Sequence, residues 1–302
     1  MNSSKSVIIT ANSKNSVRVY RSELIKKLQE LEIDVQVYSN ISAIFWFLKK
    51  FKTKPIFISS DGRSNMIMLL FCYLNGVIIL NGLGRYEKSR IIRVLMITLL
   101  RLRKNVICNV QSYRDYRYFS KYLAPNKVKW TPGSGGVARH TSKEKSQKRL
   151  LITRDGKFQP LKRKLIDKKH NLDIDIDIIG LSSVWRHGNI RSLGRVAQEC
   201  LFSKHNKFLQ LYYYGEGTPH SLVDAFASNI EIYIDRKSFR NFGMYKYISA
   251  EIGSNGLLFI NPETDGYKSY QIMTSSKNIL PIYIGDIISK LESSRNSRRE
   301  NY

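Results

Sequence analysis

Cysteine is scarce in this chain and occurs in no paired pattern. The 302 residues contain three cysteines, Cys72, Cys108 and Cys200, and none of them belongs to a C-x-x-C motif. This wide spacing argues against a disulfide framework and against a zinc site built from cysteine pairs.

A long apolar run is also missing. The longest one, MIMLLFCYLNGVIIL (66–80), is interrupted by Asn75 and Gly76. It therefore falls short of the roughly 20 apolar residues that a membrane-spanning helix needs, and it predicts a buried helix followed by a buried strand. Residues 1–16 show no signal-peptide pattern, so we expect a cytoplasmic location.

Acidic residues are half as frequent as basic ones. The chain has 24 Asp and Glu against 50 Lys and Arg, which gives a net charge of +26. Such an excess attracts nucleic acid, an anionic membrane or a phosphorylated small molecule, and composition alone does not choose among them. Codon bias in an AT-rich genome is a simpler cause of part of the lysine content. The 42% of hydrophobic residues suffices for sizeable cores.

Short apolar runs alternate with helical patterns along the chain, which indicates parallel α/β architecture. Strands are predicted at 6–11, 34–39, 55–60, 76–82, 105–110, from 128, and at 150–155, 173–180, 207–214, 230–235 and 256–261; a helix is predicted at 19–31. The predicted organisation is an N-terminal Rossmann-like domain (1–139), a polar linker (140–148), a C-terminal Rossmann-like domain (149–275), and a helix with a tail (276–302).

One stretch, YGEGTPHSLVDAFAS (214–228), places a single acid between two glycines just before a helix. Thr218 is expected as the N-cap, with Pro219 at the first helical position. A buried stripe and an opposite polar face follow from the helical period. The predicted buried residues are Leu222, Ala225 and Phe226, and the predicted polar ones are His220, Asp224 and Ser228.

The start of this helix suits a phosphate group. The amides of its first turn, around His220 and Ser221, carry the positive end of the helix dipole. Glu216 stands beside them, where Gly215 and Gly217 allow a close backbone approach. We therefore expect one site for phosphates, a sugar and a ribose.

Here the sequence resembles a known family. Glu216-x7-Asp224 resembles the E-x7-E motif of family 4 glycosyltransferases, with Asp as the second acid. Three further stretches match in the same order: NGLG (81–84), TPGSGGVA (131–138) and ITRDGK (152–157). The resemblance runs from about residue 82 to residue 234. It implies two Rossmann-like domains facing a cleft, the GT-B fold, and a retaining sugar transfer.

The resemblance also implies roles for single residues. They are Glu216 as catalytic residue; Glu216, Gly217 and Asp224 for the donor sugar and ribose; Arg154, Lys157, His220 and Ser221 for the donor diphosphate; and Gly82 and Gly84 on the acceptor side. No metal or other cofactor is expected, because cations and the helix dipole would neutralise the diphosphate.

The implied partners are a nucleotide-diphosphate sugar donor and a lipid-linked oligosaccharide acceptor at the inner membrane face. The implied process is the synthesis of a bacterial surface polysaccharide such as capsule or O-antigen, without nucleic acid. Two basic and apolar stretches, 42–54 and 90–105, suit a membrane surface, and core helices with cationic edges are the alternative.

Three other interpretations of the sequence are a metal site, nucleic-acid binding and an inactive scaffold. The acids of DIDID (173–177) could hold a metal, although strand periodicity places all three on one face near a sheet rim. The charge of +26 also suits a nucleic-acid-binding protein, but no known nucleic-acid motif is present. A transferase-like scaffold without activity is a third interpretation.

Overall fold

The computed structural model describes a large part of the chain. The described residues are 6–40, 42, 55–71, 75–83, 86, 88–133, 147–153, 175–180, 184–196, 202, 205–211, 215–253 and 256–299. The chain divides into two compact units. Unit 1 comprises residues 1–138, 214–218 and 273–302, and unit 2 comprises residues 139–213 and 219–272.

Unit 1 is built on six parallel strands in the order β2-β1-β3-β4-β5-β6. The strands are β1 (Ser6–Ala11), β2 (Asp34–Ser39), β3 (Ile56–Ser59), β4 (Gly76–Leu80), β5 (Val106–Val110) and β6 (Val128–Trp130). The helices are α1 (Lys14–Tyr20), α2 (Ser22–Glu30), α4 (Gly62–Phe71), α5 (Arg90–Leu102), α6 (Tyr113–Phe119) and α11 (Ser276–Arg299). This is the doubly wound arrangement predicted for the first half of the chain.

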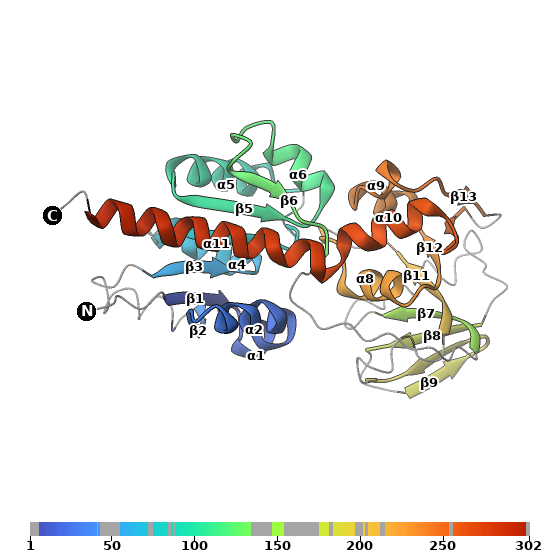
Figure 1. Ribbon diagram of the computed structural model, residues 1–302. Helices are drawn as coiled ribbons and strands as arrows, with labels where there is room; N and C mark the ends of the chain where they lie inside the picture. Colours follow the sequence, from blue (N-terminus) through green and yellow to red (C-terminus); the bar gives the residue numbers. More distant parts are fainter. Residues whose placement is uncertain are drawn as a thin grey trace. The chain divides into compact units, whose positions relative to one another are not determined.

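Both faces of this sheet are covered. Val77 and Ile79 of β4 point to a core formed with α2 and α11, whereas Ile78 and Leu80 point to a core formed with α5 and α6. This alternation follows the two-residue period of a strand and explains why β4 is apolar throughout. Figure 1 shows α11 running along unit 1. The last helix therefore helps to cover one face of the sheet formed by the first 130 residues.

The helix α11 also carries polar side chains into the core of unit 1. The Tyr283 hydroxyl donates to Thr131 Oγ1 at 3.2 Å. The Asp286 carboxylate accepts a hydrogen bond from Asn109 Nδ2 at 3.0 Å and forms an ion pair with Lys129. Because α11 makes both apolar and hydrogen-bonded contacts, its position along the sheet is fixed.

Unit 2 holds a mixed sheet in the order β13-β14-β12-β11-β7-β8-β10-β9. The strands are β7 (Gln147–Thr153), β8 (Ile176–Ile179), β9 (Val184–His187), β10 (Ile190–Leu193), β11 (His205–Gln210), β12 (Glu231–Ile234), β13 (Glu251–Ile252) and β14 (Leu258–Ile260). Strands β12, β11, β7, β8 and β10 are mutually parallel, while β9, β13 and β14 pair antiparallel with their neighbours.

The helices of unit 2 pack around aromatic side chains. They are α8 (His220–Ala227), α9 (Arg236–Asn241), the 3₁₀ turn η5 (Met244–Lys246) and α10 (Asp265–Thr274), which continues into unit 1 at residue 273. Phe226 of α8 lies between Tyr267 and Tyr270 of α10, with ring centroids 4.6 and 4.9 Å away. The Tyr267 hydroxyl donates to the Ile230 carbonyl at 2.9 Å, so this buried phenol is satisfied.

The structure corrects three boundaries. The helix predicted at 19–31 is two helices, α1 and α2, which meet at the fully buried Arg21. The strand predicted at 207–214 ends at Gln210. β7 begins at Gln147, inside the stretch predicted as a linker, whose other residues up to 146 lie outside the described residues.

The prediction for DIDID is also wrong in part. Asp177 is fully buried within β8 rather than placed near the sheet rim. Its carboxylate accepts from Arg191 Nε at 2.6 Å and Nη2 at 2.8 Å, and it lies 2.9 Å from His205 Nε2. Asp177 therefore has a partner on β10 and another on β11, and it links three strands of unit 2. Asp173 lies outside the described residues.

Cys108 offers a test of the core of unit 1. It is fully buried in β5, and burial together with the nearby Asp115 raises the pKa of its thiol. In a Cys72→Ser/Cys200→Ser variant, we expect a maleimide to label native protein at least about 100-fold more slowly than denatured protein, because labelling requires an opening of the core. Mass spectrometry of timed samples measures this rate. Equally fast labelling in native buffer would contradict the packing of β5.

Candidate functional site

The loop that follows β4 is held by its first residue, Asn81. Arg21 Nη2 donates to Asn81 Oδ1 at 2.8 Å, and Asn81 Nδ2 donates to the Ser60 carbonyl at 2.7 Å. The Asn81 carbonyl accepts from the Gly217 amide. The Arg21 guanidinium also donates to the Tyr20 carbonyl at 3.0 Å. Burial raises the pKa of the nearby Tyr283, and the positive charge of Arg21 opposes part of this rise. Asn81 is thus fixed by three separate segments of unit 1.

Two glycine-containing segments meet directly at this loop. Gly82 has φ +122°, a conformation that favours glycine, and a Cβ there would overlap the Gly215 carbonyl oxygen and lie 2.8 Å from the Glu216 carbonyl carbon. A Cβ on Gly217 would overlap the Asn81 carbonyl oxygen and lie 3.0 Å from Gln111 Cβ. The structure therefore brings the predicted residue Gly82 against the backbone of the predicted residues Glu216 and Gly217.

Thr218 has a different role from the predicted one. Its hydroxyl donates to the Gln111 carbonyl at 3.0 Å, at the end of β5, instead of capping the helix. The N-cap of α8 is Pro219, with φ −67° and ψ 145°, and no side chain caps this end. The helix consequently begins at His220, one residue later than predicted, and the amides of His220 and Ser221 lie in its first turn, where an α-helix has no internal acceptors.

The buried stripe of α8 is confirmed, and two residues of its predicted polar face are buried as well. Leu222, Ala225 and Phe226 are buried as expected. Asp224 is also buried, with 6% of its surface exposed, and so is Ser228. α8 is therefore enclosed around most of its circumference, and little of Asp224 is exposed to water.

Three of the predicted site residues, Gly84, Arg154 and Lys157, lie outside the described residues, as does the basic and aromatic stretch from residue 43 to residue 54.

Sequence reasoning missed a polar cluster at the carboxyl ends of β1, β2 and β3. Asp61 accepts from the Asn12 amide at 2.7 Å and from the Ser64 hydroxyl at 2.7 Å. Ser64 also lies 2.6 Å from Asn40 Oδ1, and Asn40 Nδ2 donates to Asn12 Oδ1 at 2.9 Å. The strand order reverses between β1 and β3, and ligands of open α/β sheets bind at such reversals. Polar residues directly after each strand were the available signal.

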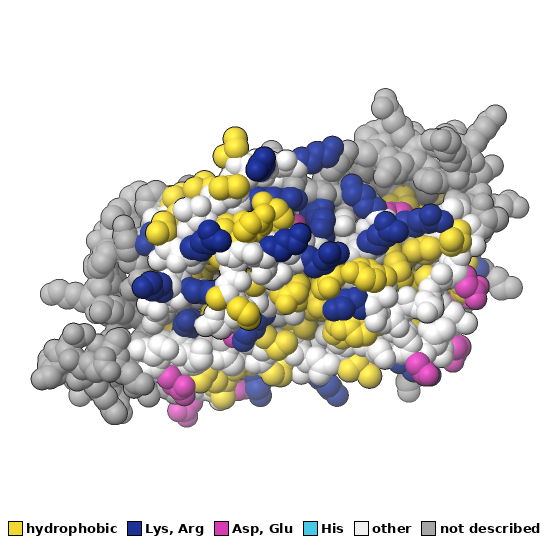
Figure 2. Space-filling model, turned by 90° about the horizontal axis from the view of Figure 1, so that it is seen from above, with side chains coloured by type: hydrophobic (Ala, Val, Ile, Leu, Met, Phe, Trp, Pro, Cys, Tyr) yellow, Lys and Arg dark blue, Asp and Glu magenta, His cyan; other side chains and the backbone are white. Residues whose placement is uncertain are grey.

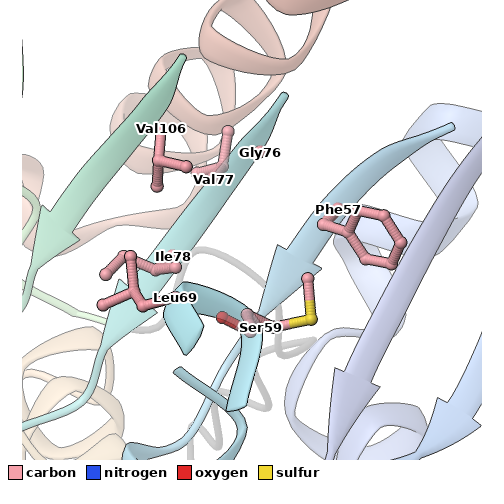
Figure 3. A pocket seen from close by; sticks show the side chains of 8 residues that line it. Phe57, Ser59, Leu69, Gly76, Val77, Ile78 and Val106 are labelled. Atoms are coloured by element: carbon pink, nitrogen blue, oxygen red, sulfur yellow. The ribbon is translucent and has the colours of Figure 1, made fainter. Parts of the chain in front are cut away.

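A small cavity lies elsewhere in unit 1, between α4 and the strands β3, β4 and β5 (Figure 3). Its lining residues are Phe57, Ser59, Met68, Leu69, Gly76, Val77, Ile78 and Val106. The cavity and the loop of Asn81 lie at opposite edges of the sheet. Gly76 and Val106, which line the cavity, begin β4 and β5, whereas Asn81 and Gln111 follow the other ends of these strands. Because the lining is almost entirely apolar, this cavity is a packing defect of the core rather than a site for a charged ligand.

The chain is similar in fold to solved structures, although no similarity in sequence was found. No protein-family model matches the chain, and no curated protein matches it in sequence. Among solved structures, the glycosyltransferase VinC in complex with dTDP is similar with a TM-score of 0.50 and 9% identity, over 95% of this chain and 100% of VinC. TarM gives a TM-score of 0.49 and 16% identity over 85% of this chain, which spans 57% of the length of TarM.

The β-glucosyltransferase of T4 phage in complex with UDP-glucose gives a TM-score of 0.47 and 11% identity, over 98% of this chain and 96% of the phage protein. At such identities a likeness shows the fold alone. The chain accordingly has the α/β fold of two Rossmann-like domains found in GT-B glycosyltransferases, as predicted.

The contact between the two glycine segments can be tested by substitution. We expect Gly217→Ala to lower the free energy of unfolding by about 1–3 kcal/mol, because its methyl group has no space beside the Asn81 carbonyl. Gly285→Ala is the matched control, since nothing lies within 4 Å of a Cβ at this position inside α11. The control is expected to raise stability by roughly 0.5–1 kcal/mol. Urea denaturation measures both, and equal effects of the two substitutions would rule out the close approach.

Proposed function

We propose that this protein is a retaining glycosyltransferase that uses a nucleotide-diphosphate sugar. The observation that carries the proposal is the contact of Gly82 with the backbone of Gly215, Glu216 and Gly217. Two stretches far apart in the sequence, which both resemble motifs of the same family of enzymes, contact each other through their backbones in unit 1. The two-domain fold is compatible with this activity and does not by itself establish it.

In this proposal the donor diphosphate binds at the start of α8. The amides of His220 and Ser221 would donate to phosphate oxygens, and the helix dipole would favour the negative charge. Arg154 and Lys157 would add two cations from the segment that follows β7. Their charges would stabilise the diphosphate as it leaves, which is the reason we expect no metal or other cofactor.

The sugar and the ribose would occupy the neighbouring positions. Glu216, held between two glycines, would contact the hydroxyl groups of the donor sugar, with Gly217 beside it. Asp224 would accept hydrogen bonds from the ribose hydroxyls of the nucleotide. The burial of Asp224 supports this role, because a side chain that is already confined loses little entropy on binding.

The transfer itself needs one bond to break and one to form. The bond from the anomeric carbon to the diphosphate oxygen breaks, and its electron pair stays with the diphosphate. An acceptor hydroxyl then bonds to the same face of the anomeric carbon, and its proton passes to the departing diphosphate. Glu216 would orient the sugar during this exchange, which makes it the residue whose loss slows the reaction most.

The acceptor is proposed to be a lipid-linked oligosaccharide of a bacterial surface polysaccharide, such as capsule or O-antigen, at the inner face of the cell membrane. Gly82 and Gly84 of the β4 loop would lie on the acceptor side. Among the described residues, no helix has the length and hydropathy needed to cross a bilayer. In this proposal the attachment to the membrane is peripheral.

The proposal is tested by the thermal stability of the purified protein with UDP, GDP, ADP or dTDP. A nucleotide at 100 times its Kd should stabilise the fold by about 2.7 kcal/mol. Arg154→Ala should abolish this stabilisation, whereas Arg195→Ala, which removes an exposed arginine of unit 2, should leave it intact. Stabilisation by none of the nucleotides, together with salt-dependent binding of duplex DNA, would instead indicate a nucleic-acid-binding protein.

A second measurement separates binding from chemistry. Release of free sugar from the stabilising nucleotide sugar should fall on the order of 100-fold in Glu216→Gln, while nucleotide binding persists. Glu263→Gln, at an exposed position in unit 2, is the control and should retain full activity. Nucleotide binding without turnover in the wild type, with water or with any lipid-linked acceptor, would identify an inactive scaffold.

A further inference from the structure

The helix α5 is apolar on two faces, of which unit 1 covers only one. Met96, Ile97, Leu99 and Leu100 are buried against the sheet. On the outer face four large aliphatic side chains are exposed: Ile91 by 79%, Val94 by 50%, Leu95 by 37% and Leu102 by 69%. An apolar stripe that the core of its own unit does not cover suits contact with a second apolar medium.

The exposed side chains form one continuous stripe. Positions 91, 95, 98 and 102 follow one another at intervals of four, three and four residues, and 94 lies three residues after 91, so all five fall on one face over the whole length of the helix. Leu70, at the end of the adjoining helix α4, is 45% exposed, and its carbonyl accepts from Arg103 Nη2 at 3.0 Å. We call the residues Ile91, Val94, Leu95 and Leu102 the α5 stripe.

The surroundings of the α5 stripe carry charge of one sign. Residues 88–114 contain no acidic residue, and the cations within the helix and directly beside its ends are Lys88, Arg90, Arg93, Arg101, Arg103 and Lys104. The next acid, Asp115, is buried and forms an ion pair with Arg114 at 3.0 Å. Figure 2 looks down on the side where Figure 1 draws α5 and α6, and there Lys and Arg side chains lie among hydrophobic ones.

Several of these cations are held in place by the fold. Arg93 lies over the Tyr118 ring, 4.9 Å from its centroid. Arg101 Nε donates to the Tyr122 carbonyl at 3.0 Å, and Arg103 Nε donates to the Leu69 carbonyl at 2.9 Å. The positive charges therefore stay beside the α5 stripe and do not move away into solvent.

We propose that the α5 stripe and its flanking cations dock on an anionic lipid bilayer. The aliphatic side chains would enter the boundary between headgroups and acyl chains, and the cations would contact the lipid phosphates. The 13 residues of α5 are too few to span a bilayer, so the helix would lie in the plane of the surface.

Two other partners fit this face less well. In a symmetric dimer the same cations would face each other across the interface with no acid between them. Nucleic acid would satisfy the cations, but the exposed side chains between them are aliphatic and cannot stack on bases. A bilayer with anionic headgroups satisfies both the apolar stripe and the charges.

Flotation with vesicles tests the proposal without any nucleotide, so it can fail or succeed independently of the transferase proposal. We expect the wild type to float with vesicles of phosphatidylglycerol and phosphatidylcholine, and at least ~10-fold less with phosphatidylcholine alone. Ile91→Gln/Leu102→Gln should weaken binding at least ~10-fold. Arg90→Gln/Lys104→Gln should weaken it by about fivefold for each removed cation, and high salt should reduce this difference.

The matched control is Ile252→Gln/Ile272→Gln, which removes two aliphatic side chains of unit 2 that are 61% and 60% exposed. It should bind vesicles as the wild type does, and circular dichroism should show that all variants fold. Equal losses in the control and in the α5 variant would overturn the proposal. So would a wild-type dimer that becomes monomeric in Ile91→Gln/Leu102→Gln, because a second copy would then cover the stripe.

Discussion

The hydrogen bonds of Asn81 fix the part of unit 1 on which the candidate site depends. Its side chain accepts a hydrogen bond from Arg21 and donates one to the Ser60 carbonyl, and its own carbonyl accepts one from the Gly217 amide. Each partner comes from a different segment: the α1–α2 junction, the end of β3, and the segment before α8. A fully buried guanidinium is costly to desolvate, so its hydrogen bonds make any other position of the loop unfavourable. The backbone around Glu216 therefore contacts a loop, that of Asn81, which has little freedom to move.

The same principle applies at the ends of the neighbouring strands. Gln111 accepts from Thr218, Asn109 donates to Asp286, and Thr131 accepts from Tyr283. Polar groups thus gather where parallel strands end, as they do in the cluster around Asp61, while the strand centres remain apolar on both faces. A doubly wound sheet separates stability from function in this way, because the apolar layers hold the strands and the loops after them are left for recognition.

Much of the fold was predictable because its signals are local. The strands of unit 1 read as apolar runs, since both faces of a parallel sheet are buried, and the residues of α8 that face the core follow the helical period. The burial of Asp177 was not predictable, since it depends on Arg191 and His205, which approach only when three strands pair. The start of α8 was misplaced for a similar reason: the Thr218 hydroxyl donates to the carbonyl of Gln111, directly after β5, and this tertiary hydrogen bond replaces the local cap. The only sign in the sequence of the contact between Gly82 and Gly217 was that both residues are glycines.

The return of α11 to unit 1 has a consequence for the order in which the protein is made. Tyr283 and Ile287 of this helix fill one face of a sheet whose strands all lie before residue 131. During translation those strands and the helices α1 and α2 leave the ribosome long before α11, so part of one face of the nascent sheet stays uncovered while more than a hundred further residues are added. Unit 2 has its strands and helices between residues 147 and 272, and it can complete its sheet during that interval. The earlier part of the polypeptide is therefore the later part to reach its native packing, and until then its exposed apolar strands are a natural substrate for chaperones.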